Sequence, residues 1–168
     1  MKRSAERGFT LVEIMIVVAI IALLAAIAIP NVLRGRTSAN ESAAIGNLRA
    51  LVSSLEMFRS VNNAYPLTAN WLANMYTTPD PDFGPPSFAH AMDGTACPPA
   101  AASACTQGFR YTYTSAAGTV YTINTNPDVL GNTGTRSFFA DESGVIRHCT
   151  GTGATVADPS IDAPPVAC

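Results

Sequence analysis

The chain has 168 residues, of which 48% are hydrophobic and only 13% are charged, with a formal net charge of −2. The apolar residues are concentrated near the N-terminus, where residues 14–29 form an unbroken apolar run of 16 residues. This distribution excludes a membrane protein with many spans and equally an ordinary cytosolic globule, while the length allows one domain with an appendage.

Charge is divided along the chain in a similar way. Residues 1–8 carry three basic side chains and one acidic one, a net charge of +2, whereas residues 61–168 carry three arginines and eight acids, a net charge of −5. Basic residues before an apolar run and an acidic body after it predict a membrane-spanning helix with its N-terminus inside. The acidic body has no basic cluster for a nucleic acid backbone, so no nucleic acid partner is expected.

Residues 9–29 would span about 30 Å as an α-helix, which is enough to cross the hydrocarbon core of a bilayer. The small-residue cleavage site of a secretory signal peptide does not follow this run, so we expect the run to be retained. Glu13 interrupts it, and an ionisable side chain in a membrane helix indicates a functional residue. The alternative is that Glu13 lies close enough to the membrane edge to reach water.

Residues 8–13 (GFTLVE), together with the basic leader before them and the apolar helix after them, resemble the processing signal of type IV prepilins and type II secretion pseudopilins. The resemblance extends to Pro30. It implies that a prepilin peptidase cuts after Gly8 and methylates the new N-terminus at Phe9. It also implies that Glu13 neutralises the N-terminal ammonium of a neighbouring subunit during assembly. Pro30 is expected to kink or locally unwind the helix.

Beyond the span, apolar residues recur at steps of three and four, which predicts that an amphipathic helix continues over residues 31–62. The apolar stripe consists of Ala44, Leu48, Leu51, Leu55 and Phe58. Polar residues, Glu41 among them, are assigned to the other side of this helix. Residues 62–66 (NNAYP) are expected to end it, because asparagine favours turns and Tyr65 precedes a proline.

Residues 63–107 have the composition of a variable loop region, with one short helix around Trp71 to Met75. Alternating and β-branched residues predict one hairpin from residues 109–114 and 120–125, and a second from residues 136–140 and 145–148. The expected fold class is therefore α+β, a long N-terminal helix packed on an antiparallel sheet of about four strands, as in pilins. Residues 134–147 also resemble the terminal hairpin of pilin-like subunits, which favours a pilus subunit.

Four cysteines in a chain that reaches an oxidising compartment predict two disulfide bonds. Three pairings are possible, and we favour Cys97 with Cys105 and Cys149 with Cys168. The second bond would tie down the tail as the disulfide-bounded loop of many pilins does.

No metal site or other cofactor is expected, because the histidines and cysteines lack ligand spacing. Calcium stays open as an alternative, with Asp141, Glu142, Asp158 and Asp162 as candidate ligands. The chain contains no nucleophile motif and no phosphate-binding loop, so an enzyme is not expected.

These observations divide the chain into a cleaved leader (1–8), a transmembrane and polymerisation helix (9–30), its amphipathic continuation (31–62), a variable loop region (63–107) and a sheet with a disulfide-bounded tail (108–168). The expected function is that of a type IV pilus subunit. One alternative is a type II secretion pseudopilin, and another is a minor pilin that acts as an adhesin or a DNA-uptake module.

The resemblance also implies the partners and the location. The partners are the prepilin peptidase, other copies and minor pilins, the inner-membrane assembly platform with its ATPase, the outer-membrane secretin and, before assembly, membrane lipid. The subunit is expected in the inner membrane first, and afterwards in an extracellular pilus or a periplasmic pseudopilus.

Overall fold

The computed structural model describes residues 9–79, 81–90, 92 and 105–168. The chain forms two compact units, which divide between Gly35 and Arg36. The expected leader, residues 1–8, and Cys97 lie outside the described residues.

The first unit is dominated by the start of α1, an α-helix of 52 residues over Leu11–Asn62. Large apolar side chains on this part of α1 are exposed all around the helix, at values from 74% for Leu11 to 51% for Ile14. A helix at a protein surface buries one apolar stripe, whereas a helix that is apolar on all sides needs an apolar environment on all sides. Within the described chain, α1 is the one helix that is long and apolar enough to cross a membrane.

Pro30 lies inside α1, which continues across it as helix, so local unwinding is not seen at this residue. The expected kink stays a prediction. Proline has no N–H group to donate to the carbonyl of Ala26, four residues earlier. In the same turn, the side-chain amide of Asn31 donates a hydrogen bond of 3.1 Å to the carbonyl oxygen of Ile27. The loss of one backbone bond in a long helix is therefore tolerated here.

The second unit contains a single six-stranded sheet in the order β1-β2-β3-β4-β5-β6. The strands are β1 (Cys105–Thr106), β2 (Phe109–Thr114), β3 (Thr122–Pro127), β4 (Arg136–Asp141), β5 (Arg147–Thr150) and β6 (Val166–Ala167). Neighbouring strands are antiparallel except β6, which pairs with β5 in parallel. The two predicted hairpins correspond to β2 with β3 and β4 with β5, and the two-residue strands β1 and β6 were not predicted.

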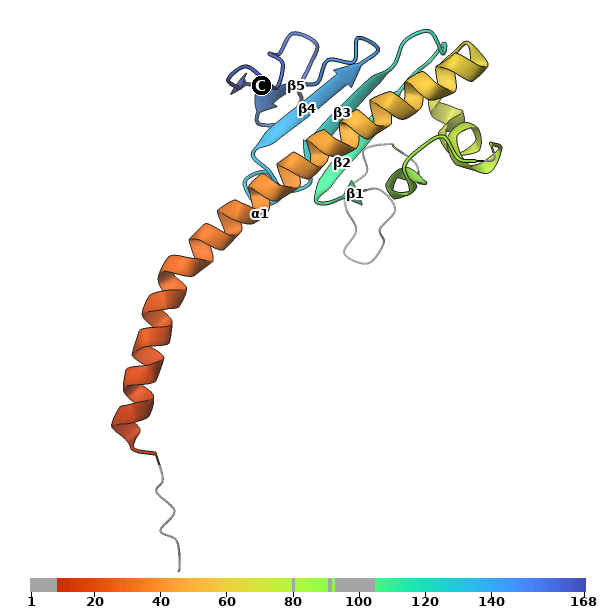
Figure 1. Ribbon diagram of the computed structural model, residues 1–168. Coiled ribbons are helices and arrows are strands. Elements are labelled where there is room, and N and C mark those ends of the chain that lie inside the picture. The colour runs from red at the N-terminus through yellow and green to blue at the C-terminus, as the bar shows by residue number, and fades with distance from the viewer. Residues whose placement is uncertain (1–8, 80, 91, 93–104) are drawn as a thin grey trace, which may run out of the picture. The chain divides into compact units, whose positions relative to one another are not determined.

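The core of this unit lies where the second half of α1 crosses one face of the sheet (Figure 1). The predicted apolar stripe of α1 is confirmed, because all five of its residues are at most 7% exposed. It packs against inward-facing aromatic and aliphatic side chains of the sheet, which include Phe109, Tyr111, Tyr113, Ile123 and Phe138. The expected α+β class is therefore confirmed.

Between α1 and β1, the described residues form three short helical segments, η1 (Thr68–Asn70), η2 (Ala73–Thr77) and η3 (Pro86–Phe88). Trp71 anchors this region, because its indole N–H donates to the carbonyl oxygen of Phe88 at 3.2 Å and its side chain is 3% exposed. The predicted loop region thus covers one end of the core with short turns of helix.

Candidate functional site

The first turn of α1 is closed by reciprocal hydrogen bonds between Thr10 and Glu13. The backbone N–H and the hydroxyl of Thr10 donate to Oε2 of Glu13 at 2.8 and 2.7 Å. In return, the backbone N–H of Glu13 donates to Oγ1 of Thr10 at 3.3 Å. This is a capping box, in which two side chains satisfy backbone donors that the first turn leaves unpaired.

The capping box holds the Glu13 carboxylate in the first turn of the helix, four residues after the exposed Phe9. A negative charge in the first turn is also favoured by the positive end of the helix dipole. Glu13 is therefore fixed in position and presented on the surface of the first unit, where a cation from another molecule can reach it.

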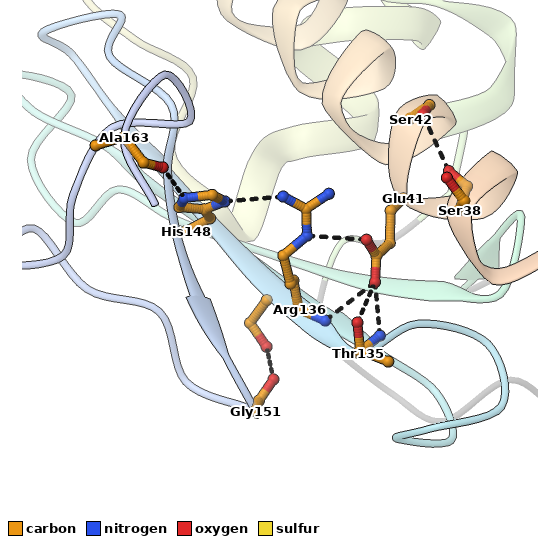
Figure 2. Close-up of polar contacts among 9 residues, drawn as sticks. Ser38, Glu41, Ser42, Thr135, Arg136, His148, Gly151 and Ala163 are labelled. Carbon is orange, nitrogen blue, oxygen red and sulfur yellow. Dashed lines mark hydrogen bonds and ion pairs between the residues drawn. The ribbon is translucent and has the colours of Figure 1, made fainter. Parts of the chain in front are cut away.

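In the second unit, Glu41 is the acidic group at the junction of helix and sheet, and it is only 6% exposed. Its Oε1 accepts hydrogen bonds from the backbone N–H and hydroxyl of Thr135 at 2.7 and 2.8 Å, and from the backbone N–H of Arg136 at 3.2 Å. Its Oε2 accepts a hydrogen bond of 2.9 Å from Nε of Arg136, which also forms an ion pair with it. Figure 2 shows these contacts joining α1 to the start of β4. The arrangement locks the helix in register with the sheet.

Arg136 extends this network to the C-terminal tail through His148, as Figure 2 also shows. Arg136 Nη1 lies 3.2 Å from Nδ1 of His148, and Nε2 of His148 lies 2.9 Å from the carbonyl oxygen of Ala163. Arginine can only donate and a carbonyl can only accept, so the imidazole accepts at Nδ1 and donates from Nε2. His148 therefore links Arg136 to the C-terminal tail through both of its ring nitrogens.

The environment of Glu41 shifts its acidity. Partial burial raises the pKa of this carboxyl, but hydrogen bonds from Thr135 and Arg136 and the Arg136 charge outweigh burial, so the pKa lies below its ordinary value of 4.5. A carboxyl whose pKa is lowered by folding stabilises the fold above its unfolded pKa. That contribution is lost as the pH falls through the lowered value.

We expect the stability advantage of the wild type over Glu41→Gln to be constant near neutral pH and to shrink below pH 4.5. Protonation of Glu41 removes the charge that Arg136 and the backbone donors bind, so acid makes the two proteins alike. The measurement is denaturant unfolding of both full chains in detergent across this pH range. A difference in unfolding free energy that is the same at neutral and acid pH would contradict the prediction.

Of the predicted processing residues, Gly8 lies outside the described residues and Phe9 directly precedes the capped helix. Cys149 and Cys168 are joined by a disulfide bond that closes the tail against β5. The pairing of Cys97 with Cys105 stays a prediction, because Cys97 is not described.

Two of the four candidate calcium ligands, Asp141 and Asp158, cap turns through their carboxylates. The carboxylate of Asp141 accepts hydrogen bonds from the backbone N–H and hydroxyl of Ser143, and that of Asp158 accepts from both groups of Thr155. Among the residues that the structure describes, no group of three or more His, Cys, Asp or Glu side chains is placed to hold a metal ion.

Two functional residues were missed by the sequence analysis. Thr10 was not recognised as the helix cap, although Thr10-x-x-Glu13 followed by apolar residues is a capping-box signature. Glu41 was assigned to the polar side of the helix, which is wrong. It lies three residues before Ala44 and seven before Leu48, so it is in phase with the buried stripe.

A family model and several curated proteins are similar to parts of this chain. A family model described as the prokaryotic N-terminal methylation motif matches residues 3–29. The chain is 37% identical over 79 residues to the type II secretion system core protein G of Klebsiella michiganensis, covering 47% of this chain and 56% of that protein. Identity to the protein of the same name from Pseudomonas aeruginosa is 38% over 79 residues, with the same two coverages.

A third relative of the same name, from Escherichia coli, is 36% identical over 74 residues, which cover 44% of this chain and 51% of that protein. The chain thus spans about half the length of the curated relatives it matches. No solved structure matches the chain.

Proposed function

We propose that the protein is a pseudopilin of a type II secretion system, because residues 3–29 match the prokaryotic N-terminal methylation motif and the chain is similar to type II secretion system core protein G. The observation that carries the proposal is the similarity to type II secretion core protein G from several bacteria, combined with an apolar helix exposed on all sides. Such a helix suits a subunit that leaves a bilayer and packs among other helices in a filament.

In this proposal, a prepilin peptidase removes residues 1–8 after Gly8 and methylates the N-terminus of Phe9. Removal of a leader with a net charge of +2 leaves a free ammonium group next to an apolar helix. Glu13 of a neighbouring copy then pairs with that ammonium as the helices stack. Two buried opposite charges are tolerated when paired and are costly when single, so the pair sets the register of assembly.

The proposed location follows from the same helix. The subunit is anchored in the inner membrane by residues 9–30, with the second unit in the periplasm, and is then drawn into a periplasmic pseudopilus. Its partners there are other pseudopilin copies, the inner-membrane assembly platform with its ATPase, and the outer-membrane secretin. The role is structural and needs no catalytic residue.

The curated relatives favour this reading over the pilus subunit that residues 134–147 suggested. In the structure, that segment forms the β4–β5 hairpin, where Phe138 and Phe139 are buried and Asp141 caps the turn. Its pattern therefore reports how the sheet of this chain is built. The roles proposed for Pro30 and Glu13 apply to a pilus and to a pseudopilus alike, so these residues do not distinguish the two.

The test is deletion of the gene in its native host, followed by complementation with the wild-type chain. We expect loss of exported proteins from the culture medium, their accumulation in the periplasm, and unchanged surface pili. Recovery of export on complementation is the matched control. Normal export together with missing surface pili would contradict the proposal and support the pilus reading instead.

A further inference from the structure

The loop between β3 and β4 exposes two aliphatic side chains at its tip. We define this tip as residues 129–133, which are Val129, Leu130, Gly131, Asn132 and Thr133. Val129 is 49% exposed and Leu130 is 54% exposed, although they are adjacent in the chain and no charged residue lies within the tip. Polar residues are usual at such a turn, so two adjacent exposed aliphatic side chains there are available for contact with another apolar phase.

Backbone and side-chain hydrogen bonds hold the tip in one shape. The N–H groups of Asn132 and Thr133 donate to the carbonyl oxygen of Val129 at 3.1 and 2.9 Å, and Gly131 N–H donates to the carbonyl oxygen of Gly134 at 2.8 Å. Gly131 adopts a φ of 83°, which suits glycine at the turn. The two aliphatic side chains are thus presented by a preorganised turn.

The tip lies beside the N-terminal end of the part of α1 that belongs to the second unit. The side-chain amide of Asn40 donates to the carbonyl oxygen of Thr133 at 3.0 Å. Asn40 follows Leu33, the last residue of the apolar segment, by only seven positions, so chain connectivity keeps it within about 25 Å of that segment. The tip is therefore on the end of the second unit that is tethered to the membrane anchor.

Charges at this end suit an anionic bilayer surface. Arg34 and Arg36 occur between the apolar segment and the tip contact in the sequence, in a chain whose residues 61–168 carry a net charge of −5. The two nearby carboxylates are paired, Asp128 with Arg110 at 3.6 Å and Glu41 with Arg136 at 2.9 Å. Long arginine side chains near the end of a membrane span place their charged groups at the level of the lipid headgroups.

We propose that, before assembly, the 129–133 tip contacts the bilayer surface with Val129 and Leu130 and holds the second unit against the membrane. This inference rests on the proposed function, because it requires the anchor to be in lipid. Two aliphatic side chains are far fewer than the 20 to 30 residues a side of a stable protein interface, so a bilayer is favoured over a second copy. Extraction of the subunit into a filament then releases the tip.

The experiment uses the full chain reconstituted into phosphatidylethanolamine and phosphatidylglycerol vesicles with acyl chains brominated near the headgroups. Bromine quenches tryptophan on contact, so Leu130→Trp and Val129→Trp report on the tip. The matched control is Val120→Trp, because Val120 is 55% exposed and lies just before β3, at the end of that strand opposite the tip. Native Trp71 is buried and adds a constant background.

We expect bromolipid to reduce the fluorescence of both tip variants relative to the wild type, and to leave Val120→Trp at the wild-type level. Equal quenching of the tip and control variants, or no quenching of either, overturns the tip contact. If the tip tryptophans are not quenched, but their emission shifts to the blue as the number of protein copies per vesicle increases, the tip contacts a second copy. That result overturns the proposed contact with the bilayer.

Flotation of the vesicles separates this result from the proposed function. If the chain floats with the vesicles and the tip is not quenched, the tip contact alone is wrong. If the chain does not float with the vesicles, the membrane anchor itself is missing and the proposed function fails as well.

Discussion

Replacement of Glu13 by glutamine is expected to leave processing intact and to reduce filament assembly by about tenfold or more, because in the proposed filament the N-terminal ammonium of the neighbouring subunit would be buried without its partner. Glutamine at this position still completes the capping box with Thr10, so the helix start is preserved. The variant therefore removes the charge and keeps the cap. The measurement compares processed subunit in membranes with subunit in isolated filaments.

Thr10→Ala is the matched control, because it removes the cap and keeps the charge. Loss of an N-cap costs about 1 kcal/mol of helix stability, and the first turn is then free to fray. We expect this variant to assemble at a level much closer to the wild type than Glu13→Gln. If Thr10→Ala is the more defective of the two, Glu13 acts through the helix cap, and the proposed pairing with a neighbouring ammonium is wrong.

The second large effect is expected on the stability of the second unit when Glu41 is replaced. Glu41→Ala should lower its free energy of unfolding by about 2 to 3 kcal/mol, because donors that Glu41 accepts from are left unpaired near the core. The value lies below that of a fully buried pair, because the side chain of Arg136 is 30% exposed and water can reach it. His148 and Ala163 are expected to loosen together with Arg136.

Ser42→Ala is the control for this prediction. Ser42 is the next residue on the helix, and its hydroxyl donates only to the carbonyl oxygen of Ser38 at 2.9 Å, on the exposed side (Figure 2). Its replacement is expected to change stability by less than about 0.5 kcal/mol. Denaturant unfolding of the full chains in detergent measures both. Equal stability of Glu41→Ala and the wild type would show that this network does not hold helix and sheet together.

Much of the fold could be predicted from the sequence, because its signals are long and periodic. The 16-residue apolar run and the stripe from Ala44 to Phe58 indicated one long helix with an apolar first half and an amphipathic second half. α1 contains both segments. Alternation in residues 109–114 predicted a strand with one buried face, and Phe109, Tyr111 and Tyr113 are all buried. These patterns predict structure well because many residues contribute to each of them.

The parts that could not be predicted depend on single residues or distant contacts. Glu41 has the periodicity of the buried stripe, but a carboxylate is rarely buried unless it has a partner. Its partner, Arg136, lies 95 residues later in the sequence, so the pairing could not be predicted. Strands β1 and β6 are two residues long and have no periodicity to detect. The Thr10 cap was detectable from its spacing alone.

The central claim is that this chain is cut after Gly8 and then polymerises through its exposed apolar helix. The most direct test is mass spectrometry of the N-terminal peptide from filaments isolated from the periplasm or sheared from the cell. The account predicts a peptide that begins at Phe9, carries one methyl group on its amine and comes from the assembled fraction. Subunits that retain residues 1–8 in the filament, or filaments that lack the chain altogether, would contradict it.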